Sequence, residues 1–236
     1  MKKKLYACWF YFVFVLSCLW VKTILDDESD DMDDMEKLKI FHYISKKWMR
    51  RFWWWTGIDV AVKGHELFPE HGPCVVVLNH RSFLDIQVAT SQLPIANKTI
   101  AKKEFKDYPL LGKISAIGSV FVDRSTRLSR VQAYKEMQTV LKRGITVIFF
   151  PEETRNTGPG LLPFQTGAFR LSHEMNVPLM VGVIRGSGET LPKGFAFTPG
   201  HVELEFITML QPTDYASYEA LSQAAQAIMT EALREK

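Results

Sequence analysis

The 236 residues suffice for one domain of ordinary size and an N-terminal extension. Its three cysteines, Cys8, Cys18 and Cys74, form no Cys-x-x-Cys pair, which argues against a disulfide framework or a thiolate metal site and favours a reducing compartment. The net charge of +3 is uneven, because residues 37–236 carry 25 Lys and Arg against 18 Asp and Glu. This basic body suits an anionic partner such as phospholipid headgroups, phosphates or nucleic acid.

The N-terminal extension begins with a membrane signal. Lys2, Lys3 and Lys4 precede residues 5–21, which are uncharged, mostly apolar and rich in aromatic side chains. No small-x-small cleavage site follows, so a cleaved signal peptide is rejected. Seventeen residues is a short length for a membrane-spanning helix. The segment could span the bilayer or lie in one leaflet, and we expect the second, with the whole chain on the cytoplasmic side.

An acidic run follows at residues 26–36, with eight acids and no base. It lacks the Gly and the spaced Glu of an EF-hand loop, so we expect a solvated, partly disordered spacer instead of a calcium site.

Residues 37–55 carry a second membrane signal in the form of an amphipathic helix. The apolar residues recur at helical spacing and the basic residues gather on the other side, as in a helix lying in the membrane plane. The alternative is a surface helix packed on the domain core. The apolar positions are Leu38, Phe41, Trp48, Phe52 and Trp55, and the basic ones are Lys39, His42, Lys46, Lys47, Arg50 and Arg51.

Strand-like and helix-like stretches alternate after residue 60, which predicts an α/β domain with a mainly parallel sheet flanked by helices. We therefore divide the chain into N-terminal membrane-anchoring helices at residues 1–58 and an α/β domain at residues 59–236. The expected strands are 74–79, 97–101, 119–122, 145–150, 179–184 and 202–207. The expected helices are 82–93, 106–117, 129–143, 164–176 and 215–235.

His80 lies where the first of these strands gives way to a helix. Asp85, five residues later, would be about one helical turn in and could hold one ring nitrogen of His80. A neutral imidazole oriented by a carboxylate is the usual general base near neutral pH. The alternative is that His80 caps a helix or satisfies a buried carbonyl group.

Charged residues follow three other predicted strands. Lys102 follows residues 97–101, Arg124 follows residues 119–122, and Glu152 and Arg155 follow residues 145–150. Ligands of such sheets bind at the carboxyl ends of the strands, where these side chains would meet. A base beside fixed cations suits a substrate that carries phosphate, because Arg grips phosphate with two hydrogen bonds.

Four blocks together resemble the glycerolipid acyltransferases typified by 1-acyl-glycerol-3-phosphate acyltransferase. They are Asn-His-Arg-Ser-Phe-Leu-Asp at 79–85, Gly-Ser-Val-Phe-Val-Asp-Arg at 118–124, Phe-Pro-Glu-Glu-Thr-Arg at 150–155 and Val-Pro-Leu-Met-Val at 177–181. Residues 102–104 and 162–169 also match stretches common in that family. The resemblance covers residues 60–210 in the family's order.

The resemblance implies transfer of a fatty acyl group from acyl-carrier protein or coenzyme A to a lysolipid hydroxyl at a membrane, most simply 1-acyl-glycerol-3-phosphate. His80 would be the base and Asp85 would orient it. Lys102 would help to hold the oxyanion, Arg124 and Arg155 the phosphate, and Glu152 the loop. No metal or further cofactor is required.

One position departs from the family pattern. The third block usually reads Glu-Gly-Thr-Arg, and Glu153 replaces the Gly. A glycine with positive φ there would make Glu costly, and the extra carboxylate would repel a dianionic headgroup. Another lysophospholipid or a lyso-aminolipid is therefore an alternative acceptor. A non-catalytic membrane lipid-binding protein is the alternative from another class, whereas no recognised motif supports nucleic-acid binding.

Overall fold

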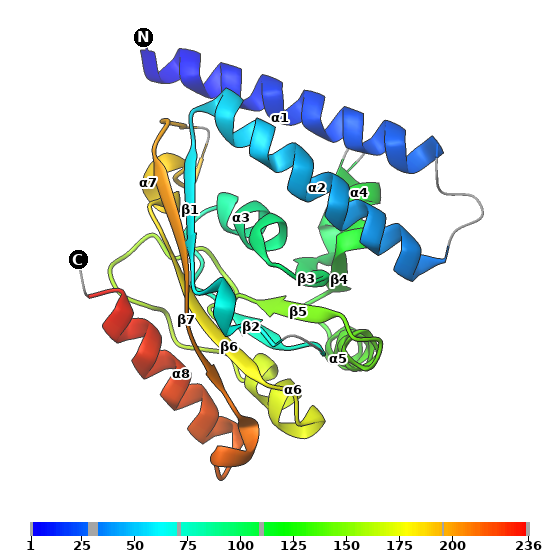
Figure 1. Cartoon of the computed structure of the whole chain (residues 1–236), viewed down its shortest axis with the longest axis vertical. Coiled ribbons are helices and arrows are strands. Elements are labelled where there is room, and N and C mark those ends of the chain that lie inside the picture. The colour runs from blue at the N-terminus through cyan, green and yellow to red at the C-terminus, as the bar shows by residue number, and fades with distance from the viewer. Residues whose placement is uncertain (1, 28–32, 70–71, 109–110, 195, 235–236) are drawn as a thin grey trace.

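A seven-stranded sheet runs through the protein and separates two layers of helices (Figure 1). The computed structural model describes residues 2–27, 33–69, 72–108, 111–194 and 196–234. The strand order is β1-β7-β6-β2-β5-β3-β4, and only β6 and β7 pair antiparallel among the described strands. The strands are β1 Asp59–Lys63, β2 Val75–Val77, β3 Asn97–Lys102, β4 Ser119–Val122, β5 Thr146–Phe149, β6 Leu179–Arg185 and β7 His201–Leu210. This mainly parallel sheet confirms the predicted fold class.

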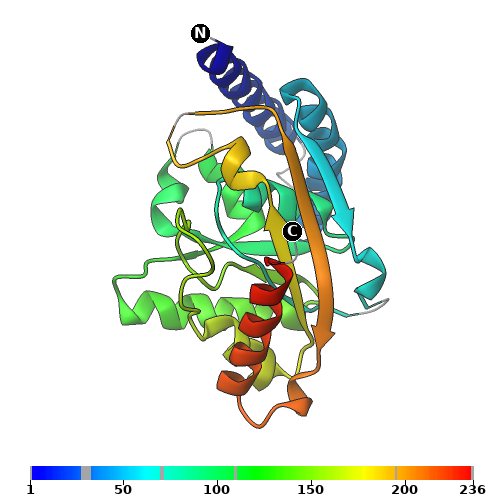
Figure 2. The ribbon, with the colours of Figure 1, turned by 90° about the vertical axis from the view of Figure 1, so that its left-hand side faces the viewer.

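The helices divide between the two faces of the sheet. They are α1 Lys2–Asp27, α2 Asp34–Thr56, α3 Leu84–Gln92, α4 Leu111–Gly118, α5 Arg127–Lys142, α6 Gly167–Met175, α7 Ser187–Thr190 and α8 Tyr218–Ala232, with 3-10 turns η1 His65–Leu67, η2 Lys103–Asp107 and η3 Pro212–Asp214. Side chains of α1 and α3 pack on one face and those of α5, α6 and α8 on the other. Helix α2 contributes to both cores, with Phe52 in the first and Leu38 in the second. Figure 2 shows the same layers after a quarter turn.

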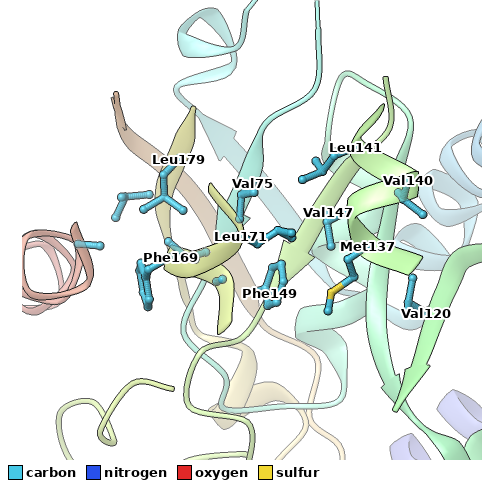
Figure 3. Close-up of a cluster of buried hydrophobic side chains, with 14 of the residues drawn as sticks. Val75, Val120, Met137, Val140, Leu141, Val147, Phe149, Phe169, Leu171 and Leu179 are labelled. Atoms are coloured by element: carbon cyan, nitrogen blue, oxygen red, sulfur yellow. The ribbon is translucent and has the colours of Figure 1, made fainter. Parts of the chain in front are cut away.

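The central strands are apolar on both faces because helices cover both. In β2, Val75 and Val77 join the core beneath α5 and α6, whereas Val76 faces α3, as the alternation of side chains along a strand requires. Figure 3 shows the first of these cores, in which Phe149 and Phe169 lie between the sheet and the helices. The carboxyl end of β2, where His80 follows, is therefore anchored in packed core.

The six predicted strands are all present, and β1 is an additional one. The sequence from Asp59 to Lys63 alternates, but it is short and has charged ends, so it was not predicted as a strand. It pairs in parallel with β7 at the edge of the sheet. The predicted helix at 106–117 divides into η2 and α4, and the predicted helix at 164–176 begins only at Gly167.

Helix α2 packs on the domain core. This is the alternative that the sequence left open beside a helix lying in the membrane plane. Leu38 and Phe52 are fully buried, so these two side chains do not face a membrane. Trp55, by contrast, is 41% exposed, and Trp48 stacks on Trp20 of α1 at 4.5 Å. The stripe therefore serves the core at some positions and the contact with α1 at others.

The acidic run is structured at its end. Asp33 accepts hydrogen bonds from the backbone N–H groups of Met35 and Glu36, and Glu36 accepts one from Asp33, which forms a capping box for α2. Residues 33–36 therefore begin a helix instead of continuing a spacer. Residues 28–32 of the predicted spacer lie outside the described residues.

Helix α1 lies across α2 and the loop that precedes β7 (Figure 1). Phe10 stacks on Phe197 at 4.4 Å and is buried, so α1 is continuous with the domain core. Its other side exposes apolar residues, among them Leu5, Trp9 and Phe12. Residues 4–24 are long and apolar enough to cross a membrane, with a mean hydropathy of 1.7, by length and composition alone.

Candidate active site

His80 and Asp85 form a hydrogen-bonded pair at the end of β2. The His80 Nδ1 atom lies 2.8 Å from the Asp85 Oδ2 atom, and the same oxygen accepts the backbone N–H groups of Arg81 at 2.6 Å and Ser82 at 2.7 Å. The Asp85 side chain is fully buried, and that of His80 is 13% exposed. A carboxylate in this position holds the Nδ1 hydrogen, so the neutral ring presents Nε2 as a proton acceptor.

The backbone around His80 is fixed from two sides. The buried Asn79 side chain exchanges two hydrogen bonds with the backbone of Ile184 in β6, at 2.9 and 2.7 Å. Glu152 accepts the N–H groups of His80 and Leu162, both at 2.8 Å. Because Glu152 is buried and both its oxygens are used, it holds the loop after β5 against His80 and does not face a ligand.

His80 opens onto a cavity of about 660 Å³. The predicted residues Lys102, Arg124 and Arg155 line the same cavity, each from the end of a different strand. The structure thus brings together all six residues expected from the sequence, four on the wall and two behind it. The cavity continues between α1, α2 and α4, where its lining is mostly apolar and includes Val21, Phe41, Trp48 and Ile114.

Two further cations of the cavity wall were not predicted. Arg130 comes from α5, and Lys193 comes from the loop before β7. Arg130 was detectable, because residues 124–135 carry four bases and no acid next to the second block. Lys193 was not detectable, because no motif surrounds it in the sequence and only the fold brings the loop before β7 to the cavity.

Helix α1 also approaches the cations. Burial raises the pKa of Tyr11, and the positive charge of Arg155 opposes that rise. Phe14 and Cys18 on the same helix line the cavity. The N-terminal helix therefore completes the wall of the site.

Comparison with known proteins identifies the family of this chain. A family model described as Acyltransferase matches residues 59–184, which is more than half of the chain. The chain belongs to the acyltransferase family. This result confirms the resemblance seen in the four sequence blocks.

Several relatives of this family are similar in sequence or structure. A chloroplastic 1-acyl-sn-glycerol-3-phosphate acyltransferase of Brassica napus is 32% identical over 176 residues, 74% of this chain and 51% of that protein. The human 1-acyl-sn-glycerol-3-phosphate acyltransferase alpha is 37% identical over 126 residues, 52% of this chain and 44% of that protein. The chain thus spans about half the length of these curated relatives. The crystal structure of the 1-acyl-sn-glycerophosphate acyltransferase PlsC from Thermotoga maritima has a TM-score of 0.86 at 27% identity and covers 100% of this chain and 97% of that one.

Glu153 marks where this chain departs from the family pattern. Its φ is 56°, so the backbone is in the left-handed region that glycine adopts freely, as the sequence led us to expect. The side chain of Arg124 donates a hydrogen bond to the Glu153 carbonyl, and its guanidinium lies 3.9 Å from the Glu153 carboxylate. Glu153 therefore binds Arg124, whose guanidinium was expected to bind only the substrate.

Proposed function

We propose that the protein transfers a fatty acyl group from a thioester of coenzyme A or a carrier protein to the free hydroxyl of 1-acyl-glycerol-3-phosphate, giving phosphatidic acid. The observation that carries the proposal is the buried His80–Asp85 pair, which opens onto a cavity that is cationic at one end and apolar at the other. This arrangement suits a substrate with both a phosphate and an acyl chain. The names of the similar acyltransferases support the same acceptor.

The proposed chemistry uses the chain's own residues. His80 Nε2 removes the proton of the acceptor hydroxyl while that oxygen attacks the thioester carbonyl, and Asp85 stabilises the imidazolium that forms. The tetrahedral oxyanion needs hydrogen-bond donors, for which we propose Lys102 or backbone N–H groups beside it. Collapse breaks the C–S bond, and the proton on His80 passes to the leaving thiolate. The mechanism needs no metal and no acyl-enzyme intermediate.

Arg155 and Arg124 would hold the acceptor's phosphate, with the apolar part of the cavity for an acyl chain. Each of these cations reaches the cavity from the carboxyl end of a strand, and His80 lines the same cavity. A second acceptor class is favoured by Glu153. Its carboxylate beside Arg124 lowers the positive charge available there, so a less anionic lysophospholipid or a lyso-aminolipid is the alternative substrate.

The reaction would take place at a membrane surface. The exposed aromatic and aliphatic side chains of α1 suit the interface of one leaflet, since Trp and Tyr prefer that depth. Because α1 also lines the cavity, a lysolipid could enter from the leaflet without crossing water. We propose that the catalytic domain lies at the cytoplasmic face.

The test is transfer by membranes that carry the protein, with acyl donor and a panel of lysolipids. Lysophosphatidate should be the best acceptor, and Arg155→Ala should raise its KM roughly tenfold to a hundredfold, as expected for loss of a charged hydrogen bond. Arg170→Ala is the matched control, because Arg170 forms an exposed ion pair with Glu174 on α6 and does not line the cavity.

The panel also separates the alternatives. Preference for a phosphate-free acceptor with unchanged kinetics in Arg155→Ala would overturn the phosphate site and favour the lyso-aminolipid. Binding of lysolipid vesicles without any transfer would favour the non-catalytic lipid-binding protein.

A further inference from the structure

The first three turns of α5 carry an exposed stripe of basic and apolar side chains beside the cavity. Leu128 is 68% exposed and Val131 is 44% exposed, and Arg127 and Lys135 flank them on the exposed surface. The opposite side of the helix is buried through Ala133, Met137 and Leu141, so the stripe faces away from the core. These side chains therefore take no part in the buried core.

Arg130 connects this stripe to the site. It shares the first turn of α5 with Arg127, but it lies three residues before the buried Ala133, on the side of the helix that faces the core, and it lines the cavity. Lys102 is the register partner of Val122, so η2, which follows Lys102 with Lys103 and Lys106, starts next to the connection from β4 to α5. Lys103 and Lys106 therefore lie near this part of the cavity, together with the acids Glu104 and Asp107 of the same turn.

The charges of the stripe work against the helix that carries them. Thr126 caps α5, yet the first turn has no acid and begins with Arg127. Positive charge at a helix N-terminus is disfavoured by the helix dipole, typically by about 0.3–1 kcal/mol. No ion pair to Arg127 or Arg130 is found within the described part of the chain. An unfavourable charge at a helix N-terminus that no nearby acid offsets is expected at functional sites.

The position of the stripe argues against the membrane as its partner. Helix α1, with its exposed apolar side, lies on one face of the sheet, and α5 lies on the other (Figures 1 and 2). A bilayer in contact with the outer side of α1 is therefore not in contact with α5. The composition of the stripe, with arginine beside exposed aliphatic side chains, is instead that of a protein–protein contact.

We propose that this stripe, made of Arg127, Leu128, Val131 and Lys135, is the docking surface for an acidic protein that carries the acyl thioester. The proposal rests on the proposed function and deepens it, because it assigns the donor to a protein carrier. The basic residues pair with acids of the carrier and steer its approach, while Leu128 and Val131 supply the apolar contact. A nucleotide such as that of coenzyme A would need cations at the cavity mouth but not the two aliphatic side chains.

The experiment compares two donors with the same acyl group, one on acyl-carrier protein and one on coenzyme A. In a variant with Arg127→Glu and Leu128→Ser, kcat/KM with the carrier protein should fall at least tenfold through KM, whereas kcat/KM with acyl-coenzyme A should change less than twofold. Lys142→Glu, in the last turn of the same helix, is the charge-matched control and should leave both values unchanged.

Other outcomes would overturn the docking surface. These are unchanged transfer from the carrier, an equal fall with both donors, or weaker binding to anionic vesicles with both donors unaffected. If the wild-type protein transfers from neither donor, the proposed function fails. Direct titration of the acylated carrier onto wild type and variant still decides the surface in that case, since equal affinity would overturn it.

Discussion

The protein contains two His–Asp pairs with the same geometry and different surroundings. His80 and Asp85 lie 2.8 Å apart at the end of β2, and His201 and Asp59 lie 2.8 Å apart at the edge of the sheet. The first pair is 13% and 0% exposed, whereas the second is 56% and 81% exposed. His80 faces the cavity, and His201 does not line it. Distance alone therefore does not identify a catalytic pair.

The surroundings decide what each pair can do. Asp85 is held by the backbone N–H groups of Arg81 and Ser82, so its carboxylate stays in place when His80 gains a proton. In the exposed pair, water competes for both partners, and such pairs contribute about 0–1 kcal/mol. Burial, supporting hydrogen bonds and an adjoining cavity distinguish the catalytic candidate.

The largest expected effect is the loss of the base. His80→Ala should lower kcat roughly 10²–10⁴-fold, which is the usual contribution of general-base catalysis. His201→Ala is the matched control and should change kcat less than twofold. The measurement is acyl transfer to lysophosphatidate by protein whose fold is checked by circular dichroism. Undiminished transfer by His80→Ala would disprove the mechanism.

The next effect concerns the carboxylate. Asp85→Asn should lower kcat roughly 10²–10³-fold with little change in KM, because the amide oxygen still accepts from His80, Arg81 and Ser82 but no longer supplies the negative charge that stabilises the imidazolium. Asp59→Asn should leave kcat unchanged. A rise in KM with a normal kcat would mean that Asp85 shapes the substrate site and does not orient the base.

The sequence predictions were right where they depended on local spacing and wrong where they depended on which distant residues cover a side chain. The strands that precede His80, Arg124 and Arg155 are strongly apolar, and the one that ends at Lys102 alternates, so their carboxyl ends, and hence the site, were predictable. Helix α2 was assigned to the membrane plane because periodicity records an apolar side without recording what covers it. Leu38 and Phe52 are buried in cores that include Val75 and Val76, which lie more than twenty positions further along the chain. The pair of Asp59 with His201 was equally invisible, since 142 positions separate its members.

A smaller effect is expected for the residue that supports His80 from behind. Glu152→Gln should lower the free energy of unfolding by about 1–3 kcal/mol, because the amide can accept from only one of the two buried backbone N–H groups while its own hydrogens face the other. Urea unfolding measures this change. Glu205→Gln, at a partly exposed carboxylate that pairs with Arg185, is the control and should cost less. Equal losses would show that Glu152 is not the special support of His80.

The smallest effect is expected at Glu153, and it separates backbone strain from charge. Glu153→Gly should stabilise the protein by about 1 kcal/mol, since φ of 56° disfavours any side chain, and Tm reports this gain. The same variant frees Arg124 from a carboxylate 3.9 Å away, so the KM for lysophosphatidate should fall a few fold. Glu153→Gln removes the charge and keeps the strain, and it should lower KM without raising Tm. If neither variant lowers KM, Arg124 does not hold the acceptor's phosphate and the Glu153 carboxylate has no part in choosing the lysolipid.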